Sequence, residues 1–427
     1  MNSGVLQALE SSFGGDQLSA SRLCGDGPEL PLVTPNSREG ILEALSVARR
    51  GGWSIVVTGL GSKLGWTRTA RRADFLLSTR RHAGVVAYEP GDGTLTARAG
   101  TTLAELASHV ASGGHGLTPD VPRPERATLG GVIGAAQSGS DRLRYGPLRD
   151  HVLGLEFALS DGTLAKCGGR LVKNVTGYDL QRLFCGSHGT LGVILEASLR
   201  LFPLPEEECS ITAVASDNAQ MLQLAGKVLA ADARPISFSV ARLDPPHAHA
   251  QWMFAVRLGG RREVVVAERA ILSSIFPGAL VQHGSEARSD AGALRDRGFG
   301  ASDGPMLRVE IRPAQFAFAL GVLDEWLRAP GASSEFRPRV WCEPGLGQID
   351  VALLPRADLG DQAVKALAQL RSALAVKGGR VRLFNGPREF VHESHGAAPA
   401  GAQLMQSIRD RLDPARVLAT GRFPEFP

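Results

Sequence analysis

Apolar and polar residues follow two different rhythms in the first half of the chain, and each rhythm predicts a different kind of element. Residues 37–52 place apolar side chains at helical spacing between a candidate N-cap, Ser37, and a closing pair of glycines, which predicts a helix. The apolar run at 54–58 predicts a buried strand that leads into a glycine loop. Thr102 and Glu105 have the spacing of a capping box, and they begin the next predicted helix.

Strand-forming residues flank turn sequences at 90–93 and 161–162, so both places predict hairpins. Residues 1–30 predict one helix and a loop. In the second half no sequence repeat is evident, and strand and helix patterns alternate, which predicts an α+β domain of ferredoxin-like topology. The predicted strands there are 210–215, 236–243, 252–258, 307–311 and 349–354, and the predicted helices are 219–231, 263–275, 314–327 and 361–376.

A change of composition near residue 204 predicts a domain boundary. Prolines at 203 and 205 precede the acidic run 206–208, and such a stretch is typical of a linker. A chain of 427 residues is long enough for two or three domains. The expected division is an N-terminal segment 1–30, a first domain 31–204, a second domain 205–400, and a C-terminal helix and tail 401–427 that return to the first domain.

Glycine is dense between residues 119 and 203, where it interrupts short apolar runs. Glycine loses more backbone entropy on folding than other residues, so its repeated use indicates left-handed backbone or the close approach of a ligand. A set of tight turns in an α+β domain is the alternative. The glycines concerned are Gly130, Gly131, Gly134, Gly139, Gly146, Gly186, Gly189 and Gly192.

An earlier glycine loop, Gly59-Leu60-Gly61-Ser62-Lys63-Leu64, follows the predicted strand at 54–58. Its amides can point at an anion without obstruction, the Ser62 hydroxyl can donate a hydrogen bond, and Lys63 adds positive charge. Neither the P-loop motif nor the dinucleotide motif G-x-G-x-x-G is complete here. The loop is therefore a candidate phosphate cradle, with a plain strand-to-loop turn as the alternative.

Composition argues against several classes of protein. The net charge of +4 is small for this length, and the arginine pairs lack interleaved aromatic residues, which argues against nucleic-acid binding. No apolar run reaches the roughly 18 residues of a transmembrane helix, and no signal pattern opens the chain, so we expect a cytoplasmic protein. The five cysteines are widely spaced and form no C-x-x-C, so we expect neither a metal site nor an iron–sulfur cluster in this chain.

Four blocks in a fixed order carry a family resemblance over roughly residues 30–203. They read VVTGLGSKLG from residue 56, TLGGVIGAAQSG from 128, RYGPLRDHVLGL from 144 and KNVTGYDLQRLFCGSHGTLGVILE from 173. The chain resembles the FAD-linked oxidases of the vanillyl-alcohol-oxidase, or PCMH, type, and within them the FAD-binding subunits of the glycolate-oxidase branch. The resemblance implies an α+β fold, with a two-subdomain PCMH-type FAD-binding domain followed by an α+β, ferredoxin-like cap domain.

The resemblance also implies that FAD lies along the glycine loops, with its pyrophosphate wrapped by the 59–64 loop. Relatives with covalently attached flavin carry a histidine in or near that loop, where this chain has Ser62 and Lys63, so noncovalent FAD is expected. The residues implied in cofactor binding are Gly59, Leu60, Gly61, Ser62, Lys63, Leu64, Pro119, Asp120, Thr128, Leu129, Gly130, Gly131, Gly134, Ser138, Gly139, Gly189, Gly192, Val193 and Ile194.

Two departures from the family pattern bear on the site. His188 stands where many relatives have glutamate, which puts in doubt any polar contact made by that acid. The C-terminal DPARVLATGRFP has Thr420 for the asparagine of the N-P-G-R that relatives often carry there, and the proline of that N-P-G-R is missing. Both changes weaken the case for a family-like flavin contact, although Arg422 is kept.

The resemblance implies an FAD-dependent oxidoreductase acting on CH–OH donors. The expected function is that of the FAD-binding subunit of a glycolate oxidase-type complex, which oxidises glycolate to glyoxylate and passes electrons through FAD to an iron–sulfur partner. The expected partners are a small 2-hydroxy acid of the glycolate or D-lactate type, a larger flavoprotein subunit and the iron–sulfur subunit, through which the chain would sit at the inner face of a membrane. The alternatives are a stand-alone FAD oxidase or dehydrogenase of a small hydroxy acid or alcohol, and a non-catalytic flavoprotein scaffold.

No catalytic residue is assigned. Oxidation of a 2-hydroxy acid needs a base for the hydroxyl proton and a cation for the carboxylate. The histidine-rich block of metal-using relatives is missing, and His392 with His395 is its nearest imitation. Arg339, Arg388 and His392 are guesses for the base and the carboxylate clamp if the chain acts on its own.

Overall fold

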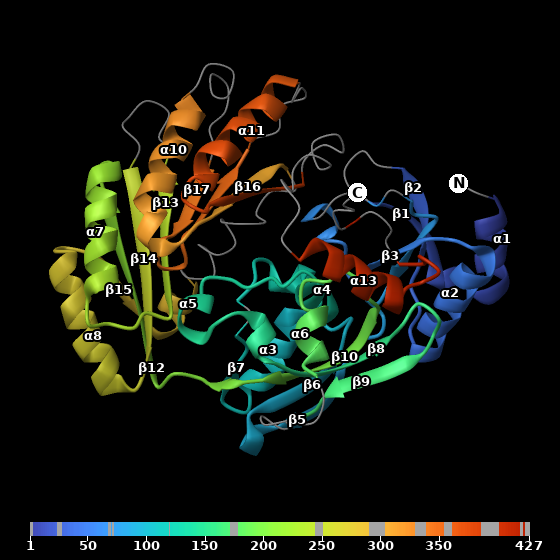
Figure 1. Ribbon diagram of the computed structural model, residues 1–427. Helices are drawn as coiled ribbons and strands as arrows, with labels where there is room; N and C mark the ends of the chain where they lie inside the picture. The colour runs from blue at the N-terminus through green and yellow to red at the C-terminus, as the bar shows by residue number, and fades with distance from the viewer. Residues whose placement is uncertain are drawn as a thin grey trace. The chain divides into compact units, whose positions relative to one another are not determined.

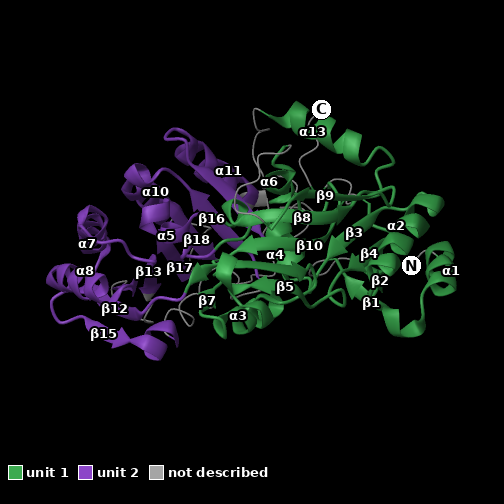
Figure 2. Cartoon of the chain, turned by 90° about the horizontal axis from the view of Figure 1, so that it is seen from below, with its two compact units in different colours: residues 1–138, 147–203, 397–427 green, residues 139–146, 204–396 purple. Residues whose placement is uncertain are grey.

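The computed structural model divides the chain into two compact units (Figures 1 and 2). Unit 1 comprises 1–138, 147–203 and 397–427, and unit 2 comprises 139–146 and 204–396. The short segment 139–146 therefore belongs to unit 2, although its neighbours on both sides in the sequence belong to unit 1. The structure describes residues 3–23, 28–66, 70, 72–118, 120–170, 178–243, 251–289, 304–328, 339–353, 361–385, 401–418 and 422.

The first sheet of unit 1 has the strand order β1-β2-β4-β3 in the part of the chain that is described, and α1 and α2 supply its apolar cover. The Ser37 side chain accepts from the Gly40 amide and Gly52 ends α2 in left-handed backbone, so the predicted helix signals are confirmed. The N-terminal segment holds more than the predicted helix and loop, because β1 pairs with β2. The bounds are α1 Ser3–Ser12, β1 Leu18–Arg22, β2 Glu29–Val33, α2 Arg38–Gly51, β3 Ile55–Thr58 and β4 Phe75–Ser78.

The second sheet of unit 1 has the order β5-β6-β10-β8-β9, and its core is shared with α3, α4 and α6. Both predicted hairpins are present, as β5–β6 and β8–β9, and Thr102 with Glu105 forms the predicted capping box. The C-terminal helix α13 packs on this core through Ile408 and Leu412. The bounds are β5 Val85–Glu89, β6 Thr94–Arg98, α3 Leu103–Ala111, β7 His115–Gly116, α4 Leu129–Gly134, β8 Val152–Ala158, β9 Leu164–Gly168, α6 Leu180–Phe184, β10 Val193–Arg200, β11 Phe202–Pro203 and α13 Ala402–Leu412.

Unit 2 is built on a sheet with the order β15-β12-β14-β13-β17-β18-β16-β19. Its two halves have the same βαββαβ connectivity, that of a ferredoxin-like fold, and they join where Val240 on β13 faces Cys342 on β17. The sequence shows no repeat because the halves share a pattern of alternating apolar residues rather than residue identities. The bounds are α5 Arg142–Tyr145, β12 Glu207–Ala215, α7 Asn218–Ala230, β13 Ser237–Leu243, β14 Gln251–Gly260, α8 Arg262–Ile275, β15 Leu280–His283, β16 Met306–Glu310, α10 Phe316–Arg328, β17 Arg339–Glu343, β18 Gln348–Ala352, α11 Asp361–Ala375 and β19 Arg380–Phe384.

The two faces of this sheet differ in chemistry. One face packs against α7, α8, α10 and α11 in a core of Val, Ile, Leu and Phe side chains. The other face carries a cross-strand row in which Trp341, Asp350, Arg308 and Arg382 face one another in register on β17, β18, β16 and β19. Asp350 and Arg308 are 2% and 8% exposed, so a charge pair is buried within this sheet face.

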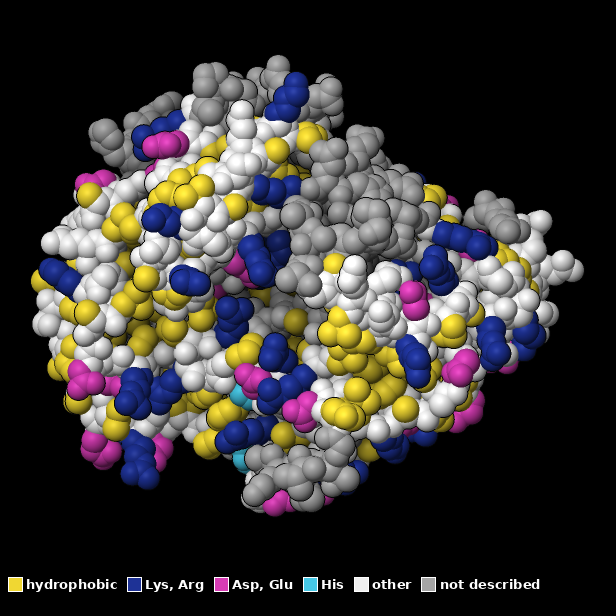
Figure 3. Space-filling view, viewed as in Figure 1, with side chains coloured by type: hydrophobic (Ala, Val, Ile, Leu, Met, Phe, Trp, Pro, Cys, Tyr) yellow, Lys and Arg dark blue, Asp and Glu magenta, His cyan; other side chains and the backbone are white. Residues whose placement is uncertain are grey.

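Charge is mixed on the surface. On the face drawn in Figure 3, Lys and Arg side chains lie interspersed with acidic and apolar ones. No helix among the described residues is long and apolar enough to cross a membrane. Within the same residues, no group of three or more His, Cys, Asp or Glu side chains is placed to hold a metal ion.

A buried histidine makes the stability of unit 1 depend on pH. His82 is 4% exposed, neither ring nitrogen has a hydrogen-bond partner within the described part of the chain, and burial together with Arg98 and Arg38 lowers its pKa. An unfolded histidine titrates near about 6.5, so below that pH the unfolded state binds more protons and unit 1 loses stability as the pH falls. The free energy of unfolding should fall between pH 7.5 and pH 5.5, and we expect this fall to be about 1 kcal/mol smaller in His82→Leu than in the wild type. Urea unfolding at the two pH values measures it. An unchanged pH slope in the variant would contradict this.

Candidate functional site

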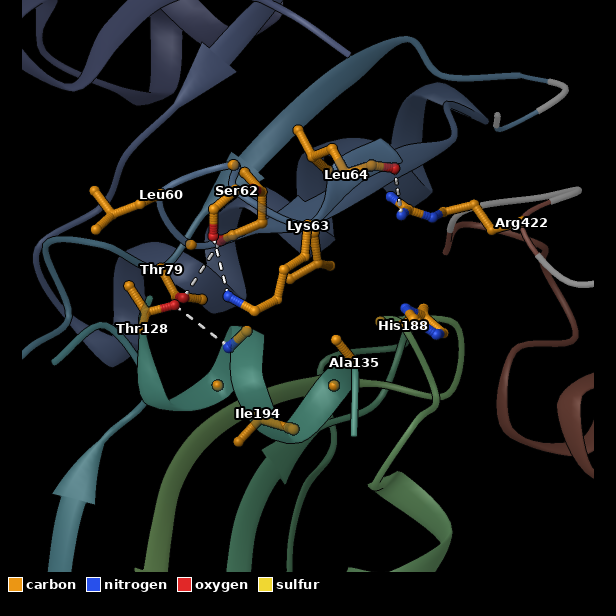
Figure 4. A pocket seen from close by; sticks show the side chains of 18 of the residues that line it. Leu60, Ser62, Lys63, Leu64, Thr79, Thr128, Ala135, His188, Ile194 and Arg422 are labelled. Atoms are coloured by element: carbon orange, nitrogen blue, oxygen red, sulfur yellow. Dashed lines mark hydrogen bonds between the residues drawn. The ribbon is translucent and has the colours of Figure 1, made fainter. Parts of the chain in front are cut away.

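A pocket in unit 1 lies where five separate parts of its chain meet (Figure 4). These are the glycine loop after β3, Thr79 just after β4, the helix α4, the turn that precedes β10 with the start of that strand, and Arg422. The empty space at the pocket, including its opening to solvent, is about 650 Å³. The described residues that line it are Val57, Thr58, Gly59, Leu60, Gly61, Ser62, Lys63, Leu64, Thr79, Thr128, Gly130, Gly131, Gly134, Ala135, His188, Gly189, Gly192, Ile194 and Arg422.

The glycine loop supplies charge to the pocket. Gly61 has a φ of 81°, a left-handed turn that a side chain would strain. Lys63 donates from Nζ to Ser62 Oγ at 3.0 Å, and burial lowers its pKa to about 8. Arg422 donates from Nη2 to the Leu64 carbonyl at 3.0 Å, which closes the loop from a position 358 residues further along the chain.

Some pocket glycines are required by protein packing. A Cβ at Gly59 would lie 2.0 Å from Thr128 Oγ1, and one at Gly130 would lie 2.8 Å from the Ala99 Cβ. Thr128 itself is the N-cap of α4 and accepts from the Gly131 amide at 3.3 Å. These residues bring the glycine loop and the start of α4 into close contact.

Gly134 is different, because nothing in the described part of the chain calls for a glycine there. It lines the pocket, it is absent from the residues with positive φ, and a Cβ on it would meet no atom of the described residues within 4 Å. An open space beside a buried glycine fits a site that a ligand fills. Together with exposed loop amides, the Ser62 hydroxyl and the Lys63 ammonium, it fits an elongated, anionic cofactor such as FAD.

The structure gathers most of the residues that the sequence implied in cofactor binding, and their contacts with FAD stay a prediction. Leu129 and Val193 point instead into the apolar core and are fully buried. Ser138 accepts from the Leu148 amide at 3.1 Å, Asp120 does not line the pocket, and Gly139 falls in unit 2. Pro119 lies outside the described residues. The implied residues that do line the pocket are Gly59, Leu60, Gly61, Ser62, Lys63, Leu64, Thr128, Gly130, Gly131, Gly134, Gly189, Gly192 and Ile194.

Sequence reasoning did not select six of the pocket residues. Val57 and Thr58 end the predicted strand, Thr79 belongs to no quoted block, and Ala135 lies in the TLGGVIGAAQSG block without being implied in binding. His188 departs from the family pattern and Arg422 agrees with it, but neither is implied as a site residue. Of the guesses for catalysis, Arg339 is an exposed residue that begins β17 of unit 2, whereas Arg388 and His392 lie outside the described residues, as does His395.

Comparisons with known proteins agree with this geometry. Residues 30–168 match the protein family described as FAD binding domain. The chain is 35% identical over 190 residues to glycolate oxidase subunit GlcE of Escherichia coli, covering 44% of this chain and 53% of the relative. It is 30% identical over 215 residues to glycolate oxidase subunit GlcD of Bacillus subtilis, covering 50% of this chain and 45% of the relative. It is 35% identical over 173 residues to D-lactate dehydrogenase of Archaeoglobus fulgidus, covering 40% and 38%.

The fold of the whole chain also has a counterpart. A solved structure of alkyldihydroxyacetonephosphate synthase matches with a TM-score of 0.73 over 99% of this chain and 86% of its own, at 16% identity. At that identity the likeness concerns the fold, and it confirms the predicted α+β class. The matched stretches span about half the length of the curated relatives or less. The predicted resemblance and the FAD cofactor are confirmed, whereas its noncovalent attachment stays a prediction.

Proposed function

We propose that this chain is the FAD-binding subunit of a 2-hydroxy acid dehydrogenase complex of the glycolate oxidase type. It would take part in oxidising glycolate to glyoxylate and hand the electrons to an iron–sulfur partner subunit. A D-lactate-type substrate is the other member of the same substrate class. The proposal includes noncovalent FAD and attachment to a larger flavoprotein subunit.

One observation carries the proposal: the glycine-lined pocket is built from the same sequence blocks that carry the resemblance to the relatives. The pocket is formed by the stretches that carry those blocks, namely the 59–64 loop, the 128–139 block and the turn before β10. Two of the relatives are named as glycolate oxidase subunits and a third as a D-lactate dehydrogenase. These names support a small 2-hydroxy acid as the substrate class.

The residues of this chain would hold the cofactor by its charge and shape. The amides of the 59–64 loop and the Ser62 hydroxyl are suited to hydrogen-bond phosphate oxygens, and Lys63 adds a positive charge beside them. Arg422 keeps the loop closed through the Leu64 carbonyl. When bound, FAD supplies the two-electron acceptor for oxidation of a carbinol carbon.

Anaerobic mixing of the purified chain with glycolate and with D-lactate tests this role, followed by the loss of flavin absorbance. We expect a yellow protein whose flavin stays oxidised until the larger flavoprotein and iron–sulfur subunits are added. Rapid bleaching of the single chain would favour a stand-alone dehydrogenase. A flavin that stays oxidised in the assembled complex with both substrates would contradict the proposed substrate class.

Lys63 should make FAD binding depend on pH in the alkaline range. Burial gives Lys63 a pKa of about 8 in the FAD-free protein, so above that pH its amine is mostly neutral. It must be protonated to bind the diphosphate, and FAD binding therefore takes up a proton. We expect the FAD dissociation constant to be flat below pH 8 and to rise by up to about tenfold per pH unit above it. Lys63→Met should bind FAD about 10- to 100-fold more weakly and lose this slope.

Fluorescence titration with FAD from pH 7 to 9.5 measures both effects. Lys365→Met on α11 removes an exposed lysine of unit 2 and is the matched control, with unchanged binding expected. A slope that persists in Lys63→Met would show that another group takes up the proton.

A further inference from the structure

Two turns face each other at the carboxyl end of α4, and they fix the backbone around His188. The amides of Gly186 and His188 donate to the carbonyls of Ile133 and Gly134 at 3.0 and 2.8 Å. These bonds tie the turn to the end of α4, where the Gly134 carbonyl takes His188 as its partner and the Ile133 carbonyl also accepts from the Ala136 amide at 3.0 Å. The position of His188 is therefore set by the backbone of the pocket wall.

Both turns use backbone that glycine prefers. His188 has a φ of 51° and Ala136, in the facing turn, has a φ of 48°. A non-glycine residue in this region costs on the order of 1 kcal/mol, and such residues gather at functional sites. The neighbouring Gly186 and Gly189 are left-handed as well, at 86° and 73°, so glycine would be accommodated at 188 with less strain.

Unsatisfied polar groups gather at the same place. Gln137 is 5% exposed and Ser187 is 3% exposed, and Gln137 Oε1 and Ser187 Oγ have no hydrogen-bond partner within the described part of the chain. They flank Ala136 and His188 in the sequence. Backbone strain together with orphaned buried polar atoms is costly, and both are retained here beside the cofactor pocket.

The His188 side chain lies at the wall of the pocket, on the side where Arg422 enters (Figure 4). Of the described lining residues, Lys63, His188 and Arg422 are those that can carry positive charge. An imidazole N–H is a donor in either tautomer, and in the charged ring both nitrogens donate. The pocket thus presents three cationic or donor groups to one anionic ligand.

We propose that His188 is a cofactor-contacting residue that donates a hydrogen bond to the diphosphate of FAD. The proposal rests on FAD as the resident cofactor and on no assumption about the hydroxy acid. The strained backbone at 188 is kept because it aims the imidazole at the ligand.

Replacement by glycine separates the two effects, since glycine suits the backbone and removes the donor. We expect His188→Gly to leave the cofactor-free protein as stable as the wild type or more so, and to weaken FAD binding about tenfold. ADP carries the diphosphate without the flavin, so its affinity, measured by displacement of FAD, should fall by the same factor. His188→Gln keeps a hydrogen-bond donor, so its FAD affinity should lie between those of the wild type and His188→Gly.

Thermal melts of the cofactor-free proteins and fluorescence titrations with FAD give these quantities. Arg416→Gly is the matched control, because Arg416 is also left-handed at 52°, is exposed, belongs to unit 1 and does not line the pocket. FAD affinity unchanged by His188→Gly would overturn the proposal. A loss for FAD without a loss for ADP would also overturn it, because the contact would then be to the flavin. Neither measurement involves a hydroxy acid, so failure here leaves the proposed oxidation untouched.

Discussion

Gly134→Ala is expected to weaken FAD binding by about 10- to 100-fold without destabilising the protein. Among the residues that the structure describes, no atom lies within 4 Å of the new methyl group, which occupies space at the pocket wall. Overpacking of a filled site costs about 1–3 kcal/mol, which is the source of the expected loss. In the cofactor-free protein, alanine should be neutral or favourable, because glycine in a helix costs about 0.5–1 kcal/mol relative to alanine.

Flavin fluorescence titration and thermal unfolding of the cofactor-free protein measure the two sides of this prediction. Gly226→Ala is the matched control, because a Cβ at Gly226 also has no atom of the described residues within 4 Å. Gly226 lies on the exposed face of α7 in unit 2, whereas the pocket belongs to unit 1. It should raise stability slightly and leave FAD binding as it was. Unchanged FAD affinity in Gly134→Ala would mean that the cofactor does not approach this glycine.

Asp350→Ala is expected to destabilise unit 2 by about 3–5 kcal/mol. Asp350 accepts from Arg308 Nε at 2.7 Å and from Nη2 at 2.9 Å, and Gln348 Nε2 donates to the same carboxylate at 2.9 Å. The pair lies on two interior strands of the sheet, β18 and β16, and both partners are almost fully buried. Removing the acid would take from a buried guanidinium the carboxylate that accepts two of its hydrogen bonds.

Urea unfolding followed by circular dichroism measures this loss. Glu310→Ala is the matched control, because Glu310 pairs with Arg382 on the same sheet face but with side chains 34% and 43% exposed. Exposed pairs contribute about 1 kcal/mol or less. The double substitution Arg308→Met with Asp350→Leu should recover most of the stability. A loss in Asp350→Ala no larger than in Glu310→Ala would contradict the burial argument.

Elements with local signals were predictable from the sequence. The capping side chains of Ser37 and Thr102 and the turns at 90–93 and 161–162 depend on residues a few positions apart, and the structure has all of them. In contrast, β1 pairs with the next strand, β2, but its sequence Leu-Ser-Ala-Ser-Arg has none of the β-branched or aromatic residues typical of strands. The repeated topology of unit 2 depends on pairing between strands far apart in the sequence. An alternating pattern fixes which face of a strand is apolar, but not which strand lies beside it.

The sequence by itself predicted an FAD binding domain through four ordered blocks that resemble those of FAD-linked oxidases, whereas the density of glycine alone left tight turns as an alternative. Only the tertiary structure decided what each glycine is for. Gly59 and Gly130 admit Thr128 and Ala99, whereas Gly134 leaves a space for a ligand. It also brought Arg422 to the glycine loop and paired Arg308 with Asp350. Such contacts join residues far apart in the chain, so they follow from packing and strand register rather than from any short motif.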